Sequence, residues 1–351
     1  MPPSARARAT PSRRAVLRAG LGGPGACLLG SLLPACASGR RAGLPPTPRR
    51  VATFGGRGTG PGQLHGPIGI AFDPVGELLV TDLHNGRVQR LGLDGAFRGA
   101  FELPRDMETA HGRSASAGGI AVGPDRRVYV TLMASHRVLI LGPDGERLGS
   151  FGERGSAAGQ LDEPGGVAVD AEGVVYVADQ VNRRIQVFSP EGRFRSTFGS
   201  YGVAAGAFDG IEPPSSRFGG PSDVALDGRG HLFTTEGAAG RVQRFTTAGE
   251  PCGSFGSKGA GPGGFGGLAT DFSPNTLGPV GVCADGNGRV WVSSLNGRVQ
   301  LFEGDGTFLA AFGRPGSGPG ELRTPHGLAL DGRGHLYVVD SGNHRVHKLA
   351  V

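Results

Sequence analysis

Three histidines are the residues of this chain best suited to bind a catalytic metal ion. His65, His111 and His326 each lie in or next to a predicted loop. Three imidazole nitrogens around an open fourth position form a catalytic zinc site, where the metal activates water or polarises a carbonyl. The same residue type in loops is more commonly solvated and without a metal. A zinc site of His65, His111 and His326 is therefore kept as the alternative to solvated loop histidines.

Asp223 is the second residue whose position suggests chemistry. It follows Ser222 at the start of a short apolar segment, and a carboxylate placed there can bind a cation. Calcium requires six to eight oxygen ligands, and one Asp supplies too few. We therefore predict a general ligand-binding role for Asp223, with calcium as an alternative cofactor.

Other catalytic signatures are missing from the sequence. It contains no nucleophile elbow, no phosphate-binding loop followed by a helix, and no Cys-x-x-Cys pair. Arginines that follow an acid by five residues, such as Arg87 after Asp82 and Arg184 after Asp179, recur along the chain. A pair that recurs in this way is expected to lock a turn by a charge-assisted hydrogen bond. We assign these pairs a structural role.

A repeated unit must position these residues. Residues 164–188, PGGVAVDAEGVVYVADQVNRRIQVF, hold three short strand-like runs separated by turn sequences, and a fourth run follows after Ser189. The pattern occurs six times at intervals of 46 to 58 residues, and every copy has an Arg at the start of its third run. Such a period predicts an all-β, six-bladed β-propeller of four-stranded antiparallel blades.

The unit resembles the NHL repeat over roughly residues 50–351. The motifs that carry the resemblance are Pro-x-Gly-Ile/Val-Ala-Val-Asp, Tyr-Val-Ala-Asp, Asn-x-Arg-Ile-Gln-Val-Phe and a closing Phe-Gly. The resemblance implies the propeller fold but no single function. Similar propellers include amidating lyases and gluconolactonase-like enzymes, which implies an alternative function as a metal-dependent lyase or hydrolase with its site at the central channel.

The two ends of the repeat region predict how the ring closes. A Phe-Gly strand at residues 51–55 precedes the first inner strand, while the last repeat stops after its third strand at Val351. We therefore expect the N-terminal strand to complete the last blade and to cover an otherwise open sheet edge.

The loops predict where a ligand binds. All long insertions fall at one end of the blades, which we call the ligand face: the end with the second-to-third turns and the outer-to-inner connections. The opposite end, the turn face, repeats short Asp-x-x-Gly turns. Aromatic and Arg side chains dominate binding hot spots, so Tyr201, Arg217 and Phe272 are predicted to bind the ligand, together with His65, His326 and Asp223.

Residues 1–36 resemble a twin-arginine export signal. Arg13 and Arg14 precede a weakly apolar, Gly-rich segment, and residues 33–36 (LPAC) resemble a lipobox whose Cys36 is lipidated after cleavage. An ordinary cleavage site before residue 38 is the alternative to lipidation. Residues 37–49 then form a Pro- and Arg-rich tether, and residues 50–351 form the propeller.

Charge excludes one class of partner. The net charge of +6 depends on residues 1–50, which hold nine Arg and no acid; the remainder has 27 basic and 30 acidic residues, a net charge of −3. No basic stripe interleaved with aromatic residues occurs in the repeats, so nucleic acid is not an expected partner. The sequence thus predicts an exported, lipid-anchored monomer of the cell envelope that binds a protein, peptide or glycan, without a cofactor, and that more closely matches a binding module than an enzyme.

Overall fold

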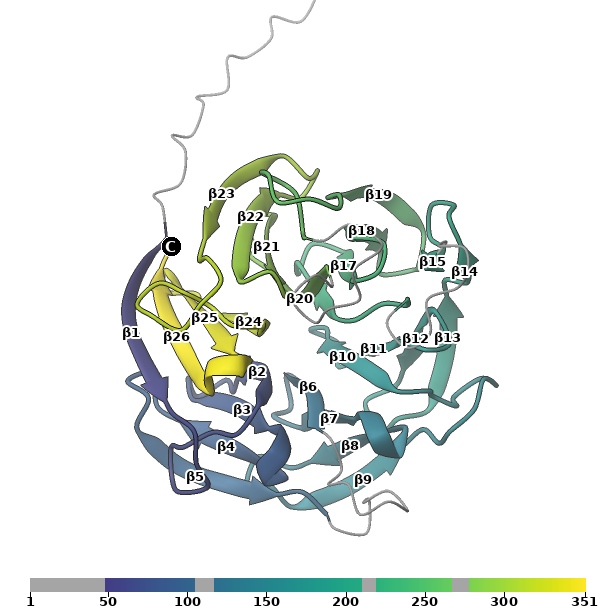
Figure 1. Ribbon diagram of the computed structural model, residues 1–351. Coiled ribbons are helices and arrows are strands. Elements are labelled where there is room, and N and C mark those ends of the chain that lie inside the picture. The colour runs from purple at the N-terminus through teal and green to yellow at the C-terminus, as the bar shows by residue number, and fades with distance from the viewer. Residues whose placement is uncertain (1–47, 105–116, 210–218, 267–277) are drawn as a thin grey trace, which may run out of the picture. The chain divides into compact units, whose positions relative to one another are not determined.

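The computed structural model describes residues 48–104, 117–209, 219–266 and 278–351. These residues belong to one compact unit, Gly43–Val351. Six four-stranded antiparallel sheets are arranged around a central axis, which confirms the predicted six-bladed propeller (Figure 1). No helix among the described residues is long and apolar enough to cross a membrane.

Each blade runs from an inner strand at the axis to an outer strand at the rim. Blade 1 comprises β2 (Pro67–Phe72), β3 (Leu78–Asp82), β4 (Arg87–Leu91) and β5 (Phe97–Glu102), and blade 2 comprises β6 (Ala117–Val122), β7 (Val128–Leu132), β8 (Arg137–Leu141) and β9 (Arg147–Phe151). Blade 3 comprises β10 (Pro164–Val169), β11 (Val175–Asp179), β12 (Arg184–Phe188) and β13 (Phe194–Phe198). Blade 4 comprises β16 (Val224–Leu226), β17 (His231–Glu236), β18 (Arg241–Thr246) and β19 (Pro251–Phe255), and blade 5 comprises β20 (Pro279–Ala284), β21 (Arg289–Ser294), β22 (Arg298–Glu303) and β23 (Phe308–Phe312).

The ring closes as the sequence predicts. Blade 6 contains β24 (Pro325–Leu330), β25 (His335–Asp340) and β26 (Arg345–Ala350), and β1 (Arg49–Gly55) adds the outer strand by antiparallel pairing with β26. Thr53 on β1 shares a hydrogen bond with His347 on β26, 2.9 Å between Oγ1 and Nδ1. The two ends of the propeller chain therefore lie in one sheet, and the edge of β26 is covered.

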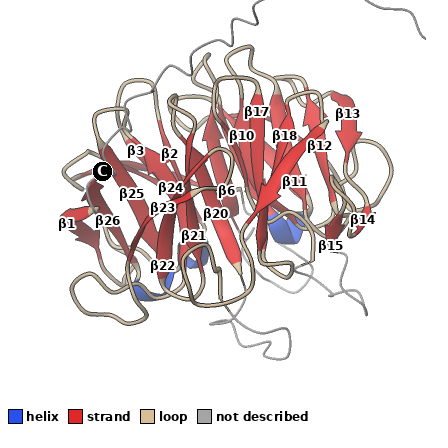
Figure 2. Ribbon diagram, turned by 90° about the horizontal axis from the view of Figure 1, so that it is seen from above, coloured by secondary structure: helices blue, strands red, loops and turns tan. Residues whose placement is uncertain are grey.

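Short helices and turns mark the two ends of the blades. The 3-10 helices η1 (Leu83–Asn85), η3 (Met133–Ser135) and η4 (Ser341–Asn343) follow second strands and lie at the ligand face, and Figure 2 shows the helices at one end of the strands. Two further strands, β14 (Tyr201–Gly202) and β15 (Phe208–Asp209), pair in the loop that enters blade 4.

The predicted acid–Arg pairs lock the turns between second and third strands. The Arg Nε lies 2.9 Å from the carboxylate in the Arg87–Asp82 pair and 2.7 Å in the Arg184–Asp179 pair. Arg87 also donates to the carbonyls of Gly60 and Gln63 in the incoming loop. The pair thus ties the turn to the neighbouring loop, and the structural prediction for these residues is confirmed.

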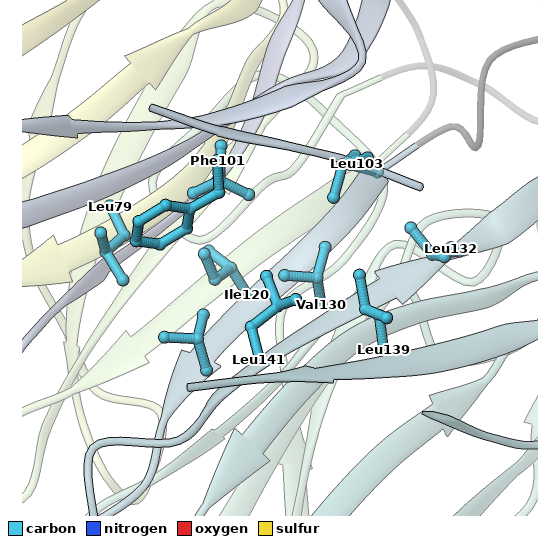
Figure 3. Packing of buried hydrophobic residues seen from close by; sticks show 11 residues of the cluster. Leu79, Phe101, Leu103, Ile120, Val130, Leu132, Leu139 and Leu141 are labelled. Atoms are coloured by element: carbon cyan, nitrogen blue, oxygen red, sulfur yellow. The ribbon is translucent and has the colours of Figure 1, made fainter. Parts of the chain in front are cut away.

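Apolar side chains fill the space between neighbouring blades. Figure 3 shows the cluster between blades 1 and 2, in which Phe101 of β5 and Leu79 of β3 lie with Ile120 of β6 and Leu141 of β8. The loops that enter blades 1, 3, 4, 5 and 6 each insert one fully buried side chain: Leu64, Leu161, Phe208, Phe265 and Leu322. The loops at the ligand face are therefore attached to the core instead of lying free on it.

Hydroxyl groups connect inner strands of successive blades. The Thr81 hydroxyl accepts a hydrogen bond from Gly69 N–H of its own blade at 2.7 Å and donates to the Gly118 carbonyl of the next blade at 2.9 Å. Thr131, Thr235 and Ser293 donate in the same way to the next blade. Blades 3 and 6 have Ala178 and Val339 at this position, so four of the six blades carry this bridge.

Candidate functional site

The inner strands surround a central channel that forms the main candidate site. It encloses about 640 Å³ and is lined mostly by Ile, Val, Leu, Ala and Gly. Residues that follow the second strands, among them Leu83, Met133, Gln180 and Leu295, surround its mouth at the ligand face. A cavity of this size accommodates a small molecule or a side chain of a larger ligand.

Glycines bring the inner strands close together below the mouth. An added Cβ at Gly119 would lie 2.8 Å from the Gly166 Cα, and one at Gly69 would lie 2.6 Å from the Gly118 carbonyl oxygen. Side chains are therefore excluded where two such strands meet. The equivalent residue in blade 4 is Asp223, the single departure from Gly at this level of the ring.

Asp223 spans the boundary between blades 4 and 5. Its Oδ1 accepts a hydrogen bond from Val224 N–H at 2.9 Å, and its Oδ2 accepts one from Val282 N–H of blade 5 at 3.0 Å. Burial raises the pKa of Asp223 to about 6, and the two backbone hydrogen bonds offset part of that effect. No Lys, Arg or His of the described residues forms an ion pair with this carboxylate.

His326 reaches the same channel from blade 6. Its Nδ1 lies 2.8 Å from the Thr324 carbonyl, which can only accept, so Nδ1 carries the proton. Burial lowers the pKa of His326, and the neutral ring is therefore favoured at pH 7. Nε2 is then a hydrogen-bond acceptor, and no described residue donates to it.

The polar side chains of the channel wall come from blades 3 to 6. Gln180 of blade 3 donates from Nε2 to the Ser222 hydroxyl at 3.3 Å, next to Asp223. Blade 5 adds the Cys283 thiol, whose pKa is raised well above its ordinary value by burial. Blades 1 and 2 contribute apolar side chains and backbone among the described residues, so the channel wall is apolar over these two neighbouring blades and carries polar groups on the other four.

His65 lies elsewhere, at the boundary between blades 6 and 1. Its ring is 4.7 Å from that of His84 and 5.4 Å from that of His344, measured between centroids. It is not among the residues that line the channel. Burial, then the charge of His65, lowers the pKa values of both His84 and His344. No local sequence pattern indicates this cluster, because His344 of blade 6 meets His65 of blade 1 only when the ring closes.

The alternative of a bound zinc or calcium ion can be tested on the side chains that could act as metal ligands. Among the described residues no group of three His, Cys, Asp or Glu side chains is arranged to hold a metal ion. His344 Nδ1 accepts a hydrogen bond from Gly66 N–H at 3.0 Å, and in the channel Asp223 has both oxygens on backbone N–H groups. His111 lies outside the described residues. The described donors do not fit zinc or calcium, and we derive no metal-dependent step.

Of the ligand-binding residues predicted on the long loops, the structure describes Tyr201. Tyr201 is 44% exposed at the start of β14, and the Arg183 guanidinium lies 5.6 Å from its ring centroid. Arg217 and Phe272 lie outside the described residues, as do Arg13, Arg14 and Cys36. Gln180 is the channel residue that the sequence analysis missed; its signal is an amide that replaces the Leu or Met found after the second strands of blades 1, 2 and 5.

Comparisons with known proteins agree with the repeats and the ring. The NHL repeat family model matches residues 161–188 and 322–349, which lie in blades 3 and 6. Two blades of the six-bladed β-propeller therefore match the NHL repeat. A search of the curated proteins finds no match.

Solved structures with the same fold include several enzymes. A streptogramin B lyase matches with a TM-score of 0.55 and 15% identity over 86% of this chain and 97% of that one. Virginiamycin B lyase from Staphylococcus aureus matches with a TM-score of 0.53 and 17% identity over 82% of this chain and 95% of that one. A gluconolactonase from Xanthomonas campestris matches with a TM-score of 0.55 and 16% identity over 87% of this chain and 94% of that one. At these identities the similarity shows the fold alone.

Proposed function

We propose that this chain is a binding protein of the cell envelope, exported through residues 1–36 and anchored through Cys36, that receives a protein, peptide or glycan at its ligand face. The observation that carries the proposal is the channel, which opens among the second-to-third turns and is lined by polar side chains from blades 3 to 6 and, among the described residues, by apolar side chains and backbone from blades 1 and 2. A surface that repeats from blade to blade offers no distinctive contact. The channel wall breaks the repeat at Gln180, Asp223 and His326, and can therefore select a ligand.

Two features favour binding over catalysis. The channel offers acceptors at fixed places, but Asp223 and His326 are each tied to backbone groups of their own surroundings. Among the described lining residues the Cys283 thiol is not a ready nucleophile, since burial raises its pKa and keeps it protonated. Lyase and gluconolactonase activities belong to the enzymes that share the fold, and the lyase or hydrolase alternative would need donors beyond the described residues.

The test is binding to envelope components with variants at both faces. The immobilised mature protein should retain a specific component from an envelope extract, and Leu295→Trp at the channel mouth should abolish retention. Tyr201→Ala, at the exposed rim, should reduce it several-fold while leaving the melting temperature nearly unchanged. Glu172→Ala, in an exposed turn of the turn face, is the matched control. Equal retention by all variants would contradict a site at the ligand face.

A further inference from the structure

We propose that the channel recognises an alkylammonium group, an aliphatic chain that ends in a primary amine, with Asp223 as its counter-charge. The inference rests on the proposed function, because it names the chemistry that the same channel would select. A lysine side chain of a peptide and a free alkylamine both present this group.

The charge balance of the channel is the first argument. Asp223 lines the cavity and accepts two backbone N–H groups, which leaves it as a carboxylate without a cationic partner among the described residues. The other lining groups that titrate, His326 and Cys283, are held neutral at pH 7 by burial. A buried carboxylate in apolar surroundings is costly unless it is paired, so a ligand that brings the missing positive charge is favoured.

The hydrogen-bonding groups point to a donor in the ligand. His326 presents Nε2 as an acceptor, because its proton is held on Nδ1 by the Thr324 carbonyl. Gln180 donates its amide N–H to Ser222, so its carbonyl oxygen is left to accept. An ammonium group has three donors and no acceptor, so it can donate to acceptors of this kind in the channel. A carboxylate or phosphate ligand would instead meet like charge.

The apolar wall fits the rest of the group. Residues of blades 1 and 2, such as Ile68, Leu83 and Met133, line the side of the channel that lacks polar side chains. The methylene chain of an alkylamine can be buried there while its charged end reaches Asp223, in the way that lysine side chains bury their stems.

The experiment compares matched probes on the full mature protein by calorimetry or NMR titration. Hexylamine should bind at least tenfold more tightly than 1-hexanol at pH 7.5, and Asp223→Asn should remove this preference while hexanol still binds. Asp144→Asn, an exposed carboxylate on another loop, is the charge-matched control and should leave the preference intact. An acetylated and amidated Gly-Lys-Gly peptide against its norleucine counterpart distinguishes a peptide source from a free amine.

The outcomes separate the inference from the proposed function. Equal binding of hexylamine and hexanol would overturn the amine preference and leave the channel as a ligand site. Binding of neither probe would count against the channel site itself. If Asp223→Asn does not fold, the preference of the His326→Gln variant for hexylamine over hexanol is compared at pH 5 and pH 7.5 instead. In this variant Asp223 is the lining group that changes its charge between the two pH values, because Cys283 stays protonated and hexylamine stays charged. A preference that is the same at both pH values would overturn the role of Asp223.

Discussion

His344 faces His65 across the boundary between blades 6 and 1, with ring centroids 5.4 Å apart. At the equivalent boundary between blades 2 and 3, His136 faces Asp162 with 3.0 Å between Nδ1 and Oδ1. The chain therefore contains the same contact in two electrostatic versions. One pairs a histidine with an acid, and the other pairs two histidines at the point where the ring closes.

We expect His65→Asp to make the protein more resistant to acid. The pKa values of His84 and His344 are lowered, so the unfolded state binds more protons below pH 6.5 and stability is lost as the pH falls from about 7 toward 5. Replacing His65 by Asp turns repulsion into attraction. Because the rings are partly exposed and screened, the gain at pH 5.5 should be about 0.5–1 kcal/mol.

Chemical denaturation between pH 5 and pH 8 measures this effect. Asp162→His is the matched control, since it installs the histidine pair between blades 2 and 3 and should make the protein more sensitive to acid. Superimposable stability curves for the wild type and His65→Asp would show that the histidines at the closure do not interact.

Adjacent threonines on β17 test the hydroxyl bridges between blades. The Thr235 hydroxyl accepts from Asp223 N–H and donates to the Val280 carbonyl of blade 5, each at 3.1 Å. Thr235→Val leaves both backbone groups without their partner and should lower the free energy of unfolding by roughly 1–3 kcal/mol. The buried hydroxyl of Thr234 has no hydrogen-bond partner among the residues that the structure describes, so Thr234→Val should be neutral or slightly stabilising. Equal losses for the two variants would contradict the bridge.

The fold could be predicted from the sequence because it depends on features that recur. Alternation of apolar residues, Asp-x-x-Gly turns and the Arg at the third strand are short-range signals repeated six times, and the position of residues 51–55 relied only on counting strands. The bridge hydroxyls also recur, but Thr and Ser in a strand give no sign of a partner in the next blade.

The site could be predicted only in part. Asp223 and His326 stood out because each departs from the repeat, and both line the channel. The contacts of His65 depend on how residues of blade 6 meet those of blade 1, which no local pattern encodes. The zinc alternative placed His65 and His326 in one site, but the structure places the two in different surroundings.

We expect the stability of the protein to depend on Asp223 with the opposite sign to the histidines. Its pKa is raised from 3.8 to about 6 by burial, so the folded state holds the proton more tightly than the unfolded state. The contribution of Asp223 to the free energy of unfolding is therefore largest below about pH 4, and it is lost as the pH rises through 6. The loss should be on the order of 1–3 kcal/mol.

Asp223→Asn should remove this part of the pH dependence, because the amide does not titrate. The measurement is the difference in unfolding free energy between variant and wild type at pH 4.5 and pH 7.5. Differences within error at the two pH values would show that Asp223 titrates normally.

The proposed export and anchoring can be tested at residues 13, 14 and 36. Lysine at both Arg13 and Arg14 should keep the precursor in the cytoplasm, because the twin-arginine pair is the feature on which the predicted signal depends. Cys36→Ala should export normally but release the protein from the membrane fraction. Fractionation and immunoblotting measure both effects. Normal export of the lysine variant, or continued membrane attachment of the Cys36 variant, would count against the corresponding step.

The outer strand of blade 6 provides the last prediction, because it tests closure of the ring. Phe54 on β1 packs with its ring centroid 6.3 Å from that of Tyr337 and fills the space above Gly95, where an added Cβ would lie 2.4 Å from its ring. A chain that begins at Gly56 loses this packing together with the β1–β26 ladder, and it exposes the edge of β26.

We expect that truncation to lower the melting temperature sharply or to cause aggregation, and Phe54→Ala alone to cost about 2–4 kcal/mol, since the ring is partly buried. Val51→Ala is the matched control on the same strand, because Val51 is 48% exposed and its loss should be close to neutral. Differential scanning calorimetry distinguishes the three proteins. If the chain from Gly56 melts like the full propeller, then β26 needs no partner, and the N-terminal strand would be an attachment to blade 6 instead of the element that closes the ring.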